Sequence, residues 1–155
     1  NKIPNVTLRT SLIVGFPGET KENFEELLEF VKDTKFDKLG TSMYSKEEGT
    51  PAAKLPNQIH GNTKKARYNK IMEAQQEISK QILEEKIGKT YKILVEDISF
   101  DKKYLIGRTM QDVPEEDGLV YIKKDKNLNE NKVLNNFVNC KIIDVSNYDL
   151  IGEIQ

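Results

Sequence analysis

The chain has 155 residues, of which 37% are hydrophobic and 32% charged, with 24 Lys and Arg against 25 Asp and Glu. This length suits one ordinary domain or two small ones, and no apolar run approaches the roughly 20 residues that a membrane-spanning helix needs. Residues 1–10 contain neither an initiator Met nor the apolar core of a signal peptide. We therefore expect a cytoplasmic, globular piece of a longer protein.

The chain has a single cysteine, Cys140, and a single histidine, His60. One cysteine can form no internal disulfide, and alone it can hold neither zinc nor an iron–sulfur cluster. The apolar neighbours of Cys140 predict a buried strand position. His60 follows a polar stretch with no second His or Cys, which predicts a surface loop. We expect no metal site and no catalytic residue within the chain.

A strand–helix–strand pattern opens the chain. Residues 8–14 predict a strand, and their apolar run is typical of a strand buried on both faces. The stretch LIVGFPGET (Leu12–Thr20) then enters a Gly-Pro-Gly turn, which can bring bare backbone close to a small ligand. Thr20 is a good N-cap for the helix that follows. Residues 36–44 predict a second strand, parallel to the first.

A loop over residues 45–62 and a long helix over residues 63–86 follow, and Gly88 ends the helix. One apolar face of this helix contains Ile71, Ile78 and Ile82, and we expect it to pack against the protein rather than to form a coiled coil. The polar face contains Lys64, Lys65, Arg67 and Lys70. We expect these side chains to be solvated, and contact with RNA is the less favoured alternative.

After Gly88 the sequence changes to short β-branched or aromatic runs separated by polar residues. Five such runs predict a small closed or nearly closed barrel: residues 92–95, 104–108, 119–123, 137–145 and 150–154. The stretch DKNLNENK, residues 125–132, predicts a polar loop. We place a domain boundary near residues 86–88, which gives an α/β domain over 1–86 and an all-β domain over 87–155.

The charge balance differs between the two predicted domains. Residues 1–86 contain 14 Lys and Arg against 13 Asp and Glu, whereas residues 87–155 contain 10 against 12. A barrel that binds nucleic acid usually has a basic face, so the local acidic patch favours a basic protein partner over RNA. That patch consists of Asp112, Glu115, Glu116 and Asp117.

Two features keep RNA open as the alternative partner of the barrel. A basic stripe is formed by Lys123, Lys124 and Lys126. An aromatic and basic face would contain Tyr104, Arg108, Tyr121 and Phe137. For Phe137 we favour a position in the barrel core.

Three motifs in order resemble the carboxyl-terminal half of the radical S-adenosylmethionine (SAM) methylthiotransferases. They are Leu12–Thr20, the stretch YSKEEGTPAAKLPNQI (Tyr44–Ile59), and a long helix that leads into five strands. The family's fold is an incomplete TIM-like barrel followed by an OB-like barrel called the TRAM domain. The segments RTMQDVPEEDGLVYI (Arg108–Ile122) and YDLIGEI (Tyr148–Ile154) resemble the RimO branch, which modifies an aspartate of small-subunit ribosomal protein twelve. The MiaB branch, which modifies a tRNA adenosine, and a stand-alone RNA-binding TRAM module are the alternatives.

The resemblance implies SAM and two [4Fe–4S] clusters in the full-length enzyme. The CxxxCxxC signature of the radical cluster is missing from the sequence, so we expect the chain alone to be inactive. The resemblance implies a cofactor pocket lined by Ile13, Val14, Gly15, Phe16, Pro17, Gly18, Glu19 and Tyr44. Plain turn glycines, a helix-terminal charge at Glu19 and rim packing by Tyr44 are the alternatives. For the basic protein substrate we expect contacts from Glu115, Glu116 and Asp117 of the TRAM tail.

Overall fold

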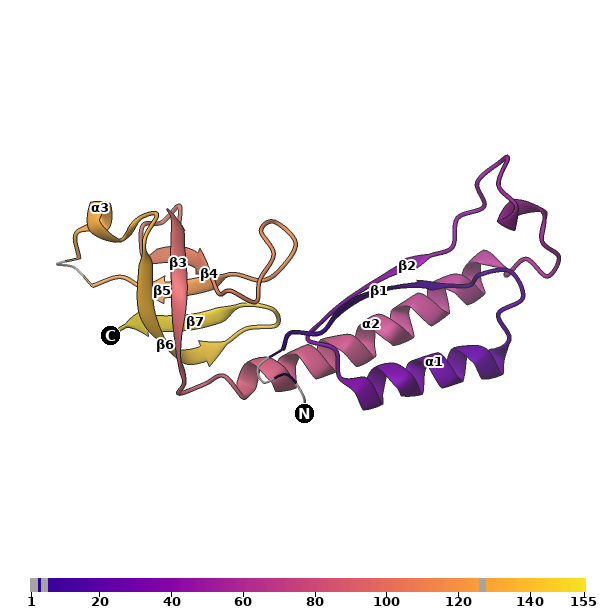
Figure 1. Ribbon diagram of the computed structural model, residues 1–155, viewed down its shortest axis with the longest axis horizontal. Helices are drawn as coiled ribbons and strands as arrows, with labels where there is room; N and C mark the ends of the chain where they lie inside the picture. Colours follow the sequence, from indigo (N-terminus) through magenta and orange to yellow (C-terminus); the bar gives the residue numbers. More distant parts are fainter. Residues whose placement is uncertain (1–2, 4–5, 126–127) are drawn as a thin grey trace. The chain divides into compact units, whose positions relative to one another are not determined.

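The computed structural model describes residues 3, 6–125 and 128–155, and the chain divides into two compact units, Asn1–Ile78 and Ser79–Gln155 (Figure 1). Each unit is described by itself below. No helix among the described residues combines the length and the apolar character that crossing a membrane requires.

The first unit contains a strand–helix–strand element. Strands β1 (Arg9–Val14) and β2 (Lys38–Met43) pair in parallel, from Arg9 opposite Lys38 to Val14 opposite Met43. Helix α1 (Lys21–Thr34) connects them, and the 3-10 turn η1 (Ala52–Lys54) follows β2. The predicted parallel unit is confirmed, with both strands slightly shorter than expected.

Helix α1 begins with a reciprocal cap. The Thr20 Oγ1 accepts a hydrogen bond from the Asn23 N–H at 3.2 Å, and the Asn23 side chain accepts one from the Thr20 N–H at 3.1 Å. This capping box pairs two backbone donors that the helix itself leaves unpaired. The helix ends at Thr34, and its C-cap residue Lys35 takes the left-handed conformation with φ 51°. The predicted N-cap at Thr20 is confirmed.

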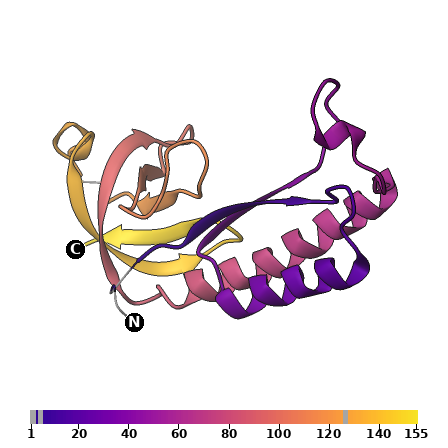
Figure 2. The same cartoon turned by 45° about the vertical axis from the view of Figure 1, so that its right-hand side comes forward.

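Helices α1 and α2 (Gly61–Glu84) lie on the same side of the β1–β2 pair (Figures 1 and 2). Because side chains alternate along a strand, Val14 is fully buried whereas its neighbour Ile13 is 59% exposed. The expectation that the first strand is buried on both faces is therefore wrong for this chain. The core of the unit contains Val14, Phe24, Val31, Ile71 and Ile78.

Helix α2 starts and ends two residues earlier than predicted. Ile71 and Ile78 are buried as expected, but Ile82 is only half-buried, and its neighbour Leu83 is the buried residue. In the first unit the buried stripe of α2 also includes polar residues, Arg67 and Gln75. It is therefore less apolar than the isoleucines alone suggest.

The second unit contains a closed five-stranded barrel, as predicted, with strand order β3-β4-β5-β7-β6. All neighbours are antiparallel except β5 and β7, which are parallel. The strands are β3 (Thr90–Ile98), β4 (Tyr104–Arg108), β5 (Val120–Lys123), β6 (Phe137–Val145) and β7 (Leu150–Ile154). A short helix, α3 (Glu130–Val133), overlaps the end of the predicted loop 125–132, of which residues 126 and 127 are outside the described residues.

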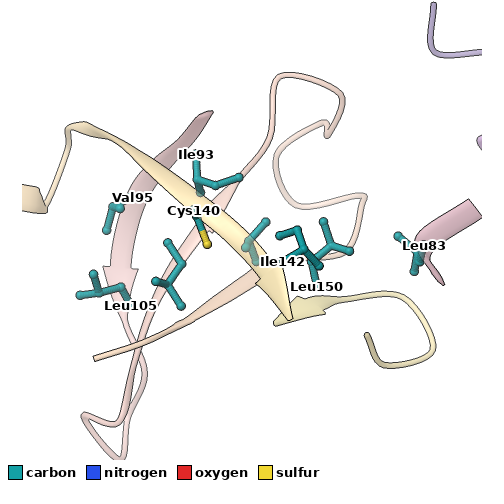
Figure 3. Close-up of a cluster of buried hydrophobic side chains, with 9 residues drawn as sticks. Leu83, Ile93, Val95, Leu105, Cys140, Ile142 and Leu150 are labelled. Carbon is teal, nitrogen blue, oxygen red and sulfur yellow. The ribbon is translucent and has the colours of Figure 1, made fainter. Parts of the chain in front are cut away.

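The barrel interior is a continuous apolar cluster (Figure 3). Its buried members are Leu83, Ile93, Val95, Leu105, Val120, Ile122, Cys140, Ile142 and Leu150. The Cys140 side chain is fully buried, as predicted, and this burial raises the pKa of its thiol to about 11.

The prediction that Phe137 fills the core is wrong, because Phe137 is 61% exposed. Strand side chains alternate between the two faces, and Cys140 and Ile142 of β6 point inward. Phe137, an odd number of residues from Cys140, therefore points outward. Its ring lies under the Lys92 ammonium, with Nζ 4.8 Å from the ring centroid.

Candidate cofactor site

The Gly-Pro-Gly turn follows directly on the carboxyl end of β1. Gly15 and Gly18 have φ of 76° and 86°, a region that side chains with a Cβ avoid. The Glu19 N–H donates to the Phe16 carbonyl at 3.0 Å, and the Gly18 N–H donates to the Asn57 carbonyl at 3.0 Å. The glycines therefore make a tight turn, and the loop after η1 is hydrogen-bonded to it.

Tyr44 lies beside this turn at the end of the second strand. Its N–H donates to the Val14 carbonyl at 2.9 Å. Its ring packs edge to face against Phe16, with the centroids 5.2 Å apart. The structure thus brings together two aromatic residues that are 28 positions apart in sequence but follow neighbouring parallel strands.

Glu19 joins the turn to helix α2. One carboxylate oxygen, Oε2, accepts the Gly15 N–H at 2.9 Å, and the other, Oε1, accepts from Arg67 Nη1 at 2.5 Å. Glu19 therefore does more than place a charge at the start of α1. The prediction that Arg67 lies on a solvated face is wrong, because Arg67 is only 9% exposed. Its position four residues before buried Ile71 was the signal that could have revealed this.

Lys64 covers the turn from the preceding part of α2. Its ammonium donates to the Tyr44 carbonyl at 2.8 Å and lies 4.8 Å from the centroid of the Tyr44 ring. Its aliphatic stem passes close to Gly15, where an added Cβ would lie 2.4 Å from Lys64 Cγ. Packing against Lys64 therefore requires a glycine at position 15 even before any ligand is considered.

The resemblance predicts that this rim contacts the adenosyl part of SAM, and the exposed apolar side chains at the rim are compatible with that prediction. Ile13 and Phe16 are half to mostly exposed apolar side chains at the carboxyl end of β1, where α/β proteins bind ligands. The Tyr44 hydroxyl is buried and has no hydrogen-bond partner among the described residues, so a polar group of a ligand would satisfy it. Val14 has its side chain in the core, which leaves only its backbone at the rim.

The three predicted substrate contacts lie in the loop between β4 and β5. Glu115 and Glu116 are exposed, and Glu115 has φ of 66°. Asp117 has a structural role, because its Oδ2 accepts the Val113 N–H at 2.7 Å. Asp112 likewise accepts the N–H and the hydroxyl of Thr109, at 3.0 and 2.6 Å. The loop also exposes apolar groups, with Met110 98% exposed.

The predicted aromatic and basic face of the barrel is only partly formed. Tyr104 and Tyr121 meet edge to face with centroids 6.0 Å apart. Arg108, however, pairs with Glu96 at 2.8 Å, and Lys124 pairs with Glu130. Lys126 of the basic stripe lies outside the described residues. Two of the cations proposed for RNA contact are thus neutralised by local carboxylates.

Among the described residues, no group of three or more His, Cys, Asp and Glu side chains is arranged to hold a metal ion. The sole cysteine points into the barrel core (Figure 3). The residues of this chain therefore do not fit a [4Fe–4S] cluster, which needs several thiolate ligands.

Comparisons with known proteins point to one family. A family model of the TRAM domain matches residues 87–154. The chain is 56% identical over 153 residues to ribosomal protein uS12 methylthiotransferase RimO of Alkaliphilus oremlandii, which covers 99% of this chain and 34% of that protein. The RimO proteins of Desulforamulus reducens and Clostridium botulinum strain Hall are 45% and 49% identical, again over 99% of this chain.

The resemblance to the radical SAM methylthiotransferases is confirmed. It extends over almost all of the chain, with RimO proteins as the matching relatives, and the second unit contains a TRAM domain. The chain spans about a third of the length of the curated relatives it matches, consistent with a carboxyl-terminal part of such a protein.

Proposed function

We propose that this chain is the carboxyl-terminal third of an enzyme that methylthiolates an aspartate of ribosomal protein uS12. Residues 1–86 would belong to an incomplete TIM-like radical SAM barrel, and residues 87–155 would form its TRAM domain. The observation that carries the proposal is the 45–56% identity to RimO proteins over 99% of the chain. The exposed, uncovered face of the β1–β2 pair supports it, because further barrel strands would enclose that face.

In this proposal the rim at the end of β1 binds the adenosyl part of SAM. When bound, SAM supplies the radical that acts on an unactivated C–H bond. Ile13 and Phe16 offer apolar surface to the cofactor, and the Tyr44 hydroxyl offers a hydrogen bond. Gly15, Pro17 and Gly18 shape the turn, Val14 contributes backbone, and Glu19 fixes the turn from behind.

The two [4Fe–4S] clusters would be held by cysteines outside this chain. Cys140 is buried in the barrel core with a raised pKa, so it is neither accessible nor ionised at neutral pH. We infer that the 155 residues alone are inactive.

The TRAM domain would recognise the protein substrate through the β4–β5 loop. Ribosomal proteins are rich in Lys and Arg, and the exposed carboxylates of Glu115 and Glu116 complement such a partner. Asp117 holds the loop in the shape that presents them. A role in tRNA modification or RNA binding is the second candidate, and the Tyr104–Tyr121 pair is its support. The pairing of Arg108 and Lys124 with carboxylates disfavours it.

The test uses the complete enzyme with Glu115→Lys and Glu116→Lys combined, and leaves Asp117 in place because it supports the loop. We expect methylthiolation of uS12, followed by mass spectrometry at limiting substrate, to fall about tenfold or more, while SAM cleavage without substrate is unchanged. The matched control carries the same charge reversals at two exposed residues of α2, Glu73→Lys and Glu77→Lys. If the loop variant modifies uS12 as well as the wild-type enzyme does, the loop is not the recognition surface. If the wild-type enzyme modifies tRNA instead of uS12, the proposed substrate is wrong.

A further inference from the structure

We propose that Arg67 is a positioning residue that sets the shape of the SAM-binding turn. This inference rests on the proposed function and assigns a role to a residue outside the GFPGE motif. The Arg67 side chain is one of three buried polar or charged ones among the described residues. Burial of a guanidinium is costly unless all its contacts are good, so its surroundings indicate what it holds.

Arg67 makes three hydrogen bonds to the start of α1. Its Nη1 donates to Glu19 Oε1 at 2.5 Å and to the Glu19 carbonyl at 3.1 Å, and its Nη2 donates to the Thr20 carbonyl at 3.2 Å. The guanidinium carbon also lies 5.4 Å from the centroid of the Phe24 ring. The planar fork therefore fixes both the side chain and the backbone of Glu19.

The hydrogen-bond chain continues from Glu19 into the turn. Since Glu19 Oε2 accepts the Gly15 N–H, the orientation of the Gly15 peptide depends on a carboxylate whose other oxygen is held by Arg67. Gly15 has no side chain to restrict its own φ of 76°. Its conformation is thus set by the chain of hydrogen bonds from Arg67 through Glu19 to Gly15.

One turn earlier on α2, Lys64 holds the neighbouring strand end through the Tyr44 carbonyl. The 64 and 67 positions are neighbours on a helix surface. The two ends of the rim, the Gly15 turn and Tyr44, are therefore fixed by the same short stretch of α2. A ligand that contacts both ends needs this spacing to within a fraction of an ångström, which makes Arg67 relevant to binding and not only to folding.

Lysine at position 67 cannot reproduce this arrangement. A guanidinium offers a rigid planar set of donors, whereas an ammonium is a point charge on a flexible stem. We expect the Arg67→Lys enzyme to keep the ion pair with Glu19 and to lose the bond to the Thr20 carbonyl. The turn would then sample other orientations, at a cost that appears when SAM binds.

The experiment measures SAM binding to the complete enzyme by equilibrium dialysis, together with its melting temperature with and without SAM. Arg67→Lys should raise the SAM Kd about tenfold, which corresponds to about 1.4 kcal/mol, and should raise the KM for SAM while the KM for the protein substrate stays unchanged. The matched control is Arg108→Lys, the same change at the Arg108–Glu96 pair of the barrel, for which we expect a wild-type Kd.

A lower melting temperature of Arg67→Lys with an unchanged SAM Kd would overturn the inference, because Arg67 would then be structural only. If Arg67→Lys does not fold, Glu19→Gln decides. It replaces one of the two accepting carboxylate oxygens by an NH2 group, which cannot accept from the Gly15 N–H or from Arg67. The Kd should therefore again rise, and a wild-type Kd would overturn the inference. Failure of the wild-type enzyme to bind SAM would instead contradict the proposed function.

Discussion

The two units of this chain are stabilised by different means. In the barrel, every strand is paired on both sides and the interior is a continuous apolar cluster. In the first unit, two strands are covered on one face only, and a buried ion pair and backbone hydrogen bonds from Arg67 and Lys64 hold the strand ends. The barrel interior is filled by apolar side chains, whereas the sheet of the first unit leaves Ile13 and Phe16 exposed at the carboxyl end of β1. We therefore expect the barrel to owe its stability mainly to apolar packing, and the first unit to depend more on polar contacts.

The largest expected effect concerns the barrel core. Ile122 is fully buried, and Ile122→Ala should lower the free energy of unfolding of the barrel by about 3 kcal/mol, from lost burial and the cavity left behind. The measurement is hydrogen exchange of the barrel amides. The matched change, Ile13→Ala on the open face of β1, should cost less than about 0.5 kcal/mol without cofactor. Equal losses at both sites would break the comparison.

The next effect contrasts two strand glycines. An added Cβ at Gly107 of β4 would lie 2.4 Å from the Leu94 carbonyl oxygen, whereas one at Gly40 of β2 would meet only Ser11 Oγ at 3.8 Å. Gly107→Ala should therefore destabilise the barrel by about 1–3 kcal/mol. Gly40→Ala should leave stability unchanged or raise it by about 0.5 kcal/mol. Denaturant unfolding of the two variants checks this, and a tolerated Gly107→Ala would show that the barrel wall can expand.

The last effect is confined to alkaline pH and concerns Cys140. Its pKa in the folded barrel is raised to about 11 by burial, above the roughly 8.5 of an exposed thiol. The unfolded chain therefore binds fewer protons than the folded one between these values, so Cys140 contributes stability below about pH 8.5 that is lost as the pH rises towards about 11. Subtracting the pH profile of Cys140→Ala isolates this loss from other titrating groups. Identical profiles would contradict the burial of the thiol.

Much of the barrel could be predicted from sequence. Its strands contain alternating or consecutive apolar residues, and polar residues mark the turns between them. The bounds 104–108, 137–145 and 150–154 agree with the structure. Phe137 was misplaced because an aromatic residue beside an apolar strand looks like a core residue until the register of Cys140 is known. Helix α3 was missed because it is a single turn in which three of the four residues are polar, for which periodicity gives no signal.

At the candidate site, the turn and the cap at Thr20 followed from Gly, Pro and Thr, whose backbone preferences are local. Arg67 did not, because its burial depends on a carboxylate 48 positions away and a charged residue is usually exposed. The proximity of Phe16 and Tyr44 was implied by the parallel strands. That the Tyr44 hydroxyl is buried without a partner among the described residues depends on packing that no sequence pattern encodes.

Helix α2 has a practical consequence for anyone who wishes to excise the TRAM domain. The family match begins at residue 87, but the compact unit begins at Ser79 and draws Leu83, from the last turn of α2, into its apolar cluster. A fragment that begins at residue 87 would lack Leu83 and would expose the side chains packed against it to water. A fragment that starts at Ser79 would keep Leu83 in the cluster, so the last turns of α2 should be included with the barrel.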